Sequence, residues 1–82
     1  MKKTRQSEIK NVIGERVREA RIKLNPPVSQ NDLVGRLARQ GIQITQTGIS
    51  KLESGNRAVL DYEVVALAKV LKVSVEWLLE GR

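Results

Sequence analysis

The chain has 82 residues, enough for one domain with a single hydrophobic core but too few for a substrate cleft between two lobes. It contains no cysteine and no histidine, which excludes disulfide frameworks, thiolate zinc sites and catalysis by an imidazole base. The formal net charge is +6, and the surplus lies in the first half: residues 1–41 hold ten Lys or Arg against four Asp or Glu, whereas residues 42–82 hold five of each. Such a surplus attracts polyanions, although an ordinary solvated surface can carry it too.

The beginning of the sequence gives no sign of export or membrane insertion. No apolar run approaches the roughly 20 residues that span a bilayer, and the basic N-terminus is not followed by the apolar region of a signal peptide. We therefore expect a cytoplasmic protein without a membrane partner. Residues 1–6 are polar and basic and are expected to form a flexible arm, and residues 7–82 to form the domain.

The first predicted helix begins near Ser7 and ends at a pair of prolines. Apolar residues recur at spacings of three and four, which places them on one helix face. They are Ile9, Ile13, Val17, Ala20 and Leu24. Pro26 and Pro27 then stop the helix, because proline lacks the amide donor and disfavours helical geometry in the residue before it.

The second predicted helix has a start signal and a stop signal. Ser29, with Asp32 three residues later, predicts a capped start, and the helix runs to about Gln40. Gly41 is its expected left-handed exit.

Three further helices follow in the same way. Thr45 is the expected cap of a third helix that runs to Ser54, Asp61 caps a fourth that continues to about residue 71, and Ser74 caps a short fifth. The apolar contacts of the fifth helix are expected from Val75, Leu78 and Leu79. No alternating pattern of period two persists, so the predicted fold is all-α, a compact arrangement of five helices.

The third predicted helix has a polar outer face. On a wheel of about 100° per residue Ile49 points inward, and Thr47, Ser50, Lys51 and Ser54 point outward. A short helix with such a face, preceded by another short helix, is what the major groove of DNA admits.

Three residues of this face suit base recognition. Gln46, in the first turn, is the leading base reader, because Gln can form two hydrogen bonds with adenine. Thr47 can contact a base edge or a thymine methyl group, and Lys51 can reach a guanine edge or a phosphate. For each residue taken singly, an ordinary solvated helix face is the competing interpretation.

Glu53 lies on the inward side of the same helix, where a lone charge would be costly. It therefore requires a partner, and Arg21 lies at the edge of the apolar stripe of the first helix. We expect an Arg-carboxylate pair that joins the two helices as structural support, without a catalytic role.

These features together resemble the lambda-repressor-like helix-turn-helix proteins, the class of phage Cro and cI repressors and related bacterial regulators of the XRE type. The resemblance extends from Ile13 to Gly81, and it rests on the segments IGERVREAR, SQNDL, TGISKLESGNR and VVALAKVLKVSVEWLLEG. It implies a helix-turn-helix formed by the second and third helices. It also implies a sequence-specific regulator of transcription that binds double-stranded DNA, most simply a repressor.

The resemblance also implies roles for individual residues. Gln30 matches a residue that binds a backbone phosphate and braces the first glutamine of the reading helix, which here is Gln46. Ser50 joins the base-facing positions, and Asn56 and Arg57 match a loop that grips phosphate.

We expect a homodimer, at least on DNA, because a twofold pair would place two reading helices about 34 Å apart on a palindromic operator. Trp77 lies in the segment that is at or near the dimer contact in related repressors, so it is an interface candidate. A partly exposed core tryptophan is the competing interpretation.

The chain departs from the usual family pattern at two points. The connection from Ala38 to Ile44 is longer than the common turn between the two helices. Gly48 lies inside the third helix, where glycine costs about 1 kcal/mol relative to alanine. Either a close approach to DNA or the packing of the helix explains such a glycine.

Two other classes of function compete with DNA recognition. An antitoxin, or another helical protein-interaction module that also binds DNA, would use the same helices against a protein partner. An enzyme is disfavoured because no nucleophile and base come together, and neither a cofactor nor a metal ion is expected.

Overall fold

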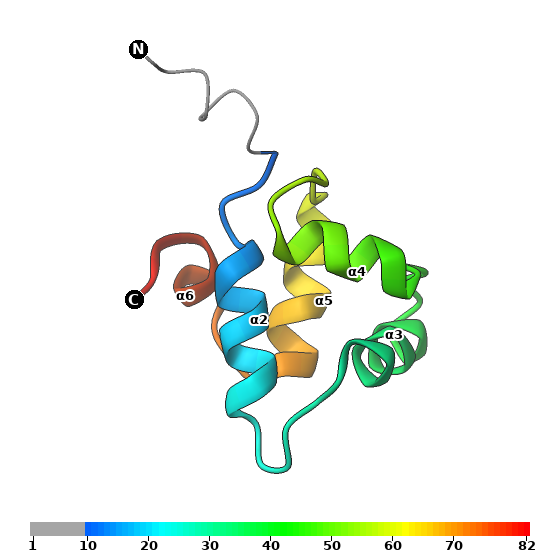
Figure 1. Cartoon of the computed structure of the whole chain (residues 1–82). Coiled ribbons are helices and arrows are strands. Elements are labelled where there is room, and N and C mark those ends of the chain that lie inside the picture. The colour runs from blue at the N-terminus through cyan, green and yellow to red at the C-terminus, as the bar shows by residue number, and fades with distance from the viewer. Residues whose placement is uncertain (1–9) are drawn as a thin grey trace.

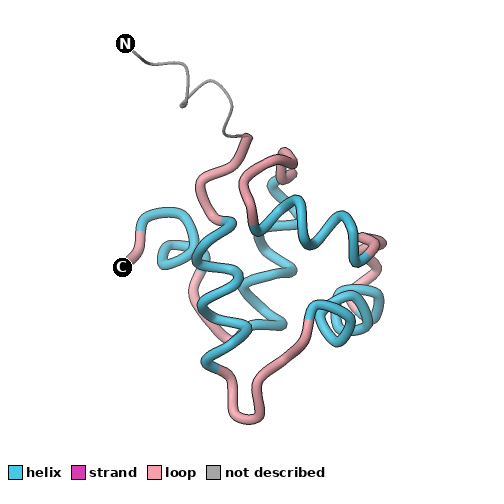
Figure 2. The backbone as a smooth tube through the Cα atoms, viewed as in Figure 1, coloured by secondary structure: helices cyan, strands magenta, loops and turns pink. Residues whose placement is uncertain are grey.

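The computed structural model describes residues 10–82, and this part of the chain contains five helices. They are α2 (Gly14–Lys23), α3 (Gln30–Arg39), α4 (Gln46–Glu53), α5 (Asp61–Leu71) and α6 (Val75–Glu80), arranged as in Figure 1. Figure 2 shows only helices and loops in this range. The all-α prediction with five helices is therefore confirmed, whereas the predicted arm and Ile9 lie outside the described residues.

The first described helix begins later than the sequence pattern predicted. Residues 10–13 are not helical, and α2 starts at Gly14. The cause is Asn11, whose side-chain oxygen accepts the N–H groups of Ile13 at 3.0 Å and of Gly14 at 2.8 Å. These bonds satisfy amides at the start of the helix, as a capping side chain does. The prediction of a helix through residues 10–13 was wrong.

Three of the four predicted caps are present. Ser29 and Asp32 form a reciprocal capping box, Thr45 accepts the N–H of Gly48, and Ser74 accepts the N–H of Trp77.

The cap of the fourth predicted helix was assigned to the wrong residue. Asp61 is the first helical residue of α5, and the N-cap position belongs to Leu60. A leucine side chain cannot accept a hydrogen bond. The Glu63 carboxylate instead turns back and accepts the Leu60 N–H at 3.0 Å.

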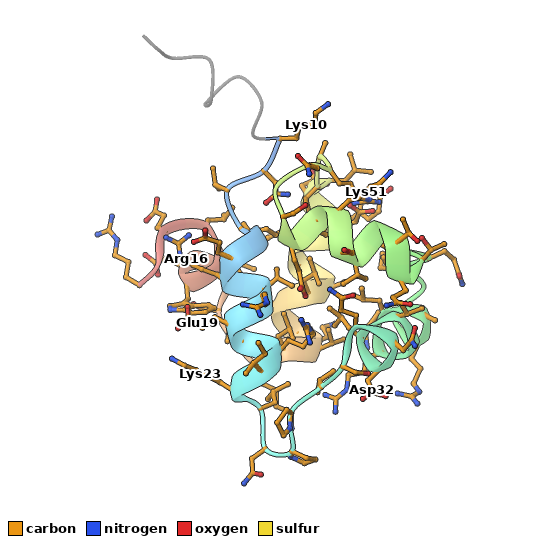
Figure 3. The ribbon with its side chains drawn as sticks, in the orientation of Figure 1. Lys10, Arg16, Glu19, Lys23, Asp32 and Lys51 are labelled. Carbon is orange, nitrogen blue, oxygen red and sulfur yellow. The ribbon has the colours of Figure 1, made fainter. Side chains whose placement is uncertain are left out.

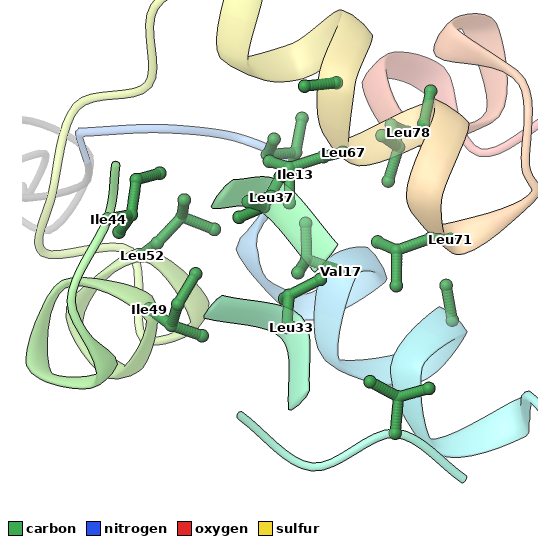
Figure 4. Close-up of a cluster of buried hydrophobic side chains, with 14 residues drawn as sticks. Ile13, Val17, Leu33, Leu37, Ile44, Ile49, Leu52, Leu67, Leu71 and Leu78 are labelled. Atoms are coloured by element: carbon green, nitrogen blue, oxygen red, sulfur yellow. The ribbon is translucent and has the colours of Figure 1, made fainter. Parts of the chain in front are cut away.

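The core lies where the five helices meet, and each helix contributes to it (Figure 4). Its fully buried side chains include Val17, Leu33, Leu37, Ile49, Leu52, Leu67, Leu71 and Leu78. Leu79 was predicted to point inward but is 43% exposed, because α6 places Leu78 in the core with Val75 and Trp77 packed beside it and leaves Leu79 outside the cluster. Among residues 10–82, no helix is both long and apolar enough to cross a bilayer.

A glycine allows α2 to pack closely against α4. At Gly14 an added Cβ would lie 2.8 Å from the Glu53 carbonyl oxygen and nearer still to that of Leu52. Because real Cβ atoms essentially never approach so closely, only glycine permits this separation of the two helices. The start of α2 is thus pressed against the end of α4.

Candidate nucleic-acid interface

The outer face of α4 is polar and exposed, whereas its inner face is fully buried. Ile49 and Leu52 are anchored in the core. The four predicted base readers, Gln46, Thr47, Ser50 and Lys51, are all exposed. This geometry leaves the hydroxyl, amide and ammonium groups of one helix available to an external ligand.

Gly48, inside α4, has a packing explanation. A Cβ at this position would lie 2.8 Å from the Cγ2 methyl of Ile44 and 3.4 Å from the Thr45 hydroxyl oxygen. Ile44 is buried and belongs to the connection that precedes α4. The glycine therefore makes room for the chain's own connection between α3 and α4.

Glu53 is held by Arg21 in a two-point ion pair. The Arg21 Nε donates to Oε2 at 2.7 Å and Nη2 donates to Oε1 at 2.9 Å. The two side chains are only 11% and 4% exposed, and Arg21 also donates to the Val28 carbonyl. The hydrogen bond to Glu53 raises the pKa of the Arg21 guanidinium, so the cation is retained. The pair connects α2 to α4, as the helical wheel had suggested.

The same carboxylate continues into a polar chain that ends at the first turn of α4. Gln30, the first residue of α3, donates from Nε2 to the Glu53 Oε1 at 3.1 Å. Its Oε1 then accepts from the Gln46 Nε2 at 3.4 Å, a long contact between exposed groups. Gln46 is thereby linked through Gln30 and Glu53 to the buried guanidinium of Arg21.

Asn56 and Arg57 follow α4 in the loop that leads to α5. The Asn56 backbone N–H donates to the Lys51 carbonyl at 2.8 Å, and its side chain donates to the Ser54 hydroxyl at 3.1 Å. Asn56 is exposed next to the outer face of α4. Its position leaves it accessible to a phosphate.

Arg57 forms an ion pair that the sequence interpretation missed. Its Nη1 and Nη2 donate to the two carboxylate oxygens of Glu63 at 3.0 and 3.2 Å. The Arg57 hydrogen bond lowers the pKa of Glu63, whose side chain is 6% exposed, while that of Arg57 is 29% exposed. Glu63 lies four residues before the inward-facing Leu67, so helical periodicity places this carboxylate on the buried face of α5. The same argument had placed Glu53 on the inward side of α4. Phosphate binding by Arg57 stays a prediction. A phosphate bound there would accept from the same guanidinium that donates to Glu63.

Asn11 is a second residue whose contacts the sequence interpretation missed. Its side-chain Nδ2 donates to the Leu52 carbonyl at 3.0 Å and to the Arg57 carbonyl at 2.7 Å. The neighbouring Lys10 N–H donates to the Gly55 carbonyl at 2.8 Å. One short segment before α2 therefore holds both the end of α4 and the loop after it.

Trp77 is half-buried on α6 and packs against the core. Its position is compatible with both interpretations offered by the sequence, so its place in a dimer contact stays a prediction.

The comparison with protein families agrees with this architecture. A family model described as helix-turn-helix matches residues 36–78, from the second half of α3 to Leu78 in α6. No curated protein and no solved structure gives a significant match to the chain.

Proposed function

The chain belongs to the lambda-repressor-like, XRE-type helix-turn-helix family of DNA-binding regulators, and from this premise we propose that it is a sequence-specific transcriptional regulator that reads duplex DNA with α4. A repressor of phage or bacterial type, acting in the cytoplasm, is the simplest form. The observation that carries the proposal is the exposed polar face of α4 opposite the buried Ile49 and Leu52.

Base recognition is assigned to the exposed side chains of α4. Gln46 presents an amide that suits the N6 and N7 edge of adenine, and Gln30 lies beside it with a contact at 3.4 Å. Thr47 and Ser50 offer hydroxyl groups to base edges, and Lys51 offers a cation to guanine or to a phosphate.

Phosphate binding is assigned to residues on both sides of the reading helix. Gln30 lies at the start of α3, and Asn56 and Arg57 lie in the loop after α4. Contacts of this kind fix the register of a protein on the duplex without reading its sequence. The basic surplus of the first half of the chain would add long-range attraction to the same polyanion.

A homodimer on a palindromic operator completes the proposal. Two copies related by a twofold axis would place their α4 helices about 34 Å apart, in successive major grooves on one side of the duplex. Trp77 on α6 is the residue assigned to the contact between copies.

Selection of bound sequences from a random duplex pool tests the proposal. We expect an enriched palindrome, and Gln46→Ala should weaken binding to it by about 1 to 3 kcal/mol while leaving non-specific binding nearly unchanged. Gln40→Ala is the matched control, because Gln40 is an exposed glutamine at the end of α3, outside α4.

Two results would reject this function. A pool without any enriched sequence would remove sequence recognition. If Gln46→Ala weakened the binding of a protein partner and left the affinity for DNA intact, the antitoxin or interaction-module alternative would be favoured.

A further inference from the structure

The segment before α2 is attached to the loop after α4, although the two are far apart in the sequence. Lys10 contributes its backbone N–H to the Gly55 carbonyl at 2.8 Å. Asn11 bonds across to the carbonyls of Leu52 and Arg57, over sequence separations of 41 and 46 residues. These three bonds fix the backbone of Lys10 next to the loop that carries Asn56.

Asn11 is well suited to hold this position. Both N–H groups of its amide nitrogen have carbonyl acceptors, and its oxygen accepts two backbone amides at the start of α2. The side chain is partly buried, so these bonds are protected from competition with water. A fully satisfied amide of this kind leaves Lys10 little freedom to move relative to Gly55.

The side chain of Lys10 is exposed at the same end of the molecule as Lys51 (Figure 3). Both lysines are linked by backbone hydrogen bonds to the loop after α4. The Asn56 N–H donates to the Lys51 carbonyl, and the Lys10 N–H donates to the carbonyl of Gly55, the residue before Asn56. In the same view Lys23 lies at the opposite end of α2.

We propose that Lys10 is a further phosphate-binding residue of the DNA surface, and that Asn11 positions it there; this rests on the proposed reading of DNA by α4. The loop after α4 carries Asn56 and Arg57, which are assigned above to phosphate, and Lys10 lies beside that loop. The lysine ammonium on its flexible stem is a point charge that binds phosphate without demanding one fixed geometry.

A salt series with a charge-matched control tests the assignment. Wild type, Lys10→Gln and Lys23→Gln are compared on the duplex selected above, and both variants lose one positive charge. Lys10→Gln should lose one phosphate contact. The slope of log K against log salt should therefore be smaller in magnitude by about 0.9 than in the wild type. The slope of Lys23→Gln should equal that of wild type.

The affinity of Lys10→Gln should fall to a similar degree on selected and unrelated duplexes, because a phosphate contact carries no sequence information. Equal slopes in all three proteins would overturn the proposal for Lys10 while the selected palindrome still supports the proposed function. A lower melting temperature of Lys10→Gln with an unchanged slope would also overturn it, since the lysine would then act only on the negative end of the α4 dipole.

The positioning role of Asn11 is tested by Asn11→Ala, alone and combined with Lys10→Gln, at a temperature where each variant is folded. We expect Asn11→Ala to reproduce the slope of Lys10→Gln, and the double variant to show no further reduction. A stability loss in Asn11→Ala with the wild-type slope would leave Asn11 a purely structural residue and overturn this part of the proposal.

Discussion

Two buried carboxylates, Glu53 and Glu63, fix the surroundings of α4. Each is paired with an arginine through two hydrogen bonds, Glu53 with Arg21 and Glu63 with Arg57. A buried carboxylate without a partner is strongly unfavourable, so each pair allows only a narrow range of relative positions. The first pair sets α4 against α2, and the second closes the loop between α4 and α5.

Removing the Glu53 carboxylate should destabilise the fold. Glu53→Ala leaves the buried Arg21 without its partner, and breaking a buried pair in this way costs about 3 to 5 kcal/mol. The exposed pair of Glu19 with Lys23 provides the control, because Glu19→Ala should cost at most about 1 kcal/mol. Urea unfolding of both variants measures the difference, and an equal loss in the two would contradict the role given to Glu53.

The Glu63 pair should make stability depend on pH in the acidic range. Its folded-state pKa is lowered, chiefly by the Arg57 hydrogen bond, so the stabilisation is complete above the unfolded pKa of about 4.3 and is lost as pH falls through the folded value. Glu63→Gln removes this titration. In urea unfolding the stability gap between wild type and Glu63→Gln should therefore be largest near neutral pH and should narrow as the solution is acidified. A gap that does not change with pH would contradict this assignment.

At the scale of elements, the closeness of α2 and α4 depends on Gly14. Alanine in a helix interior is normally better than glycine by about 1 kcal/mol, but a Cβ at Gly14 would clash with backbone oxygens of α4. Gly14→Ala should therefore lower the free energy of unfolding. Gly35→Ala in α3 is the control and should raise it, because Gly35 is exposed and a Cβ there would meet nothing within 4 Å. Thermal or urea unfolding measures the free energy of unfolding of both variants. If both alanine substitutions raised it, α2 and α4 would be able to move apart without loss of stability.

The sequence predicted the features that depend on neighbouring residues. Caps at Ser29, Thr45 and Ser74 are local hydrogen bonds, and an inward Glu53 follows from helical periodicity alone. The family resemblance extended this to the helix-turn-helix, which the family match supports.

The sequence did not predict features that depend on long-range contacts, on the residue at which a helix begins or on how a helix is turned in the fold. The late start of α2 results from the Asn11 oxygen, which accepts the amides of Ile13 and Gly14. The same side chain is held in place by carbonyls more than 40 positions away, which no local pattern reveals. Asp61 was a good capping residue by type, but α5 begins at Asp61 itself, and the Glu63 carboxylate accepts the amide of the N-cap residue Leu60. Leu79 had the right spacing, but α6 turns Leu78 and Trp77 toward the core instead.

For the whole molecule, the proposed dimer predicts a strict dependence on operator spacing. Two α4 helices held by a twofold contact match half-sites whose centres are separated by about one helical turn of DNA. Inserting about five base pairs between the half-sites turns one of them to the opposite side of the duplex, so cooperative binding should be lost. Gel-shift titrations of both operators measure this cooperativity. An affinity that the insertion does not change would indicate that the copies bind as independent monomers.

The half-buried indole of Trp77 gives this molecule a built-in spectroscopic reporter. It is the sole tryptophan of the sequence, and it lies on α6, away from the side chains assigned to DNA. Its fluorescence therefore senses the docking of α6 without any added dye. Dilution of a dimer held together by this helix should shift the emission toward longer wavelengths, whereas a constant spectrum across concentrations would place the contact between copies elsewhere.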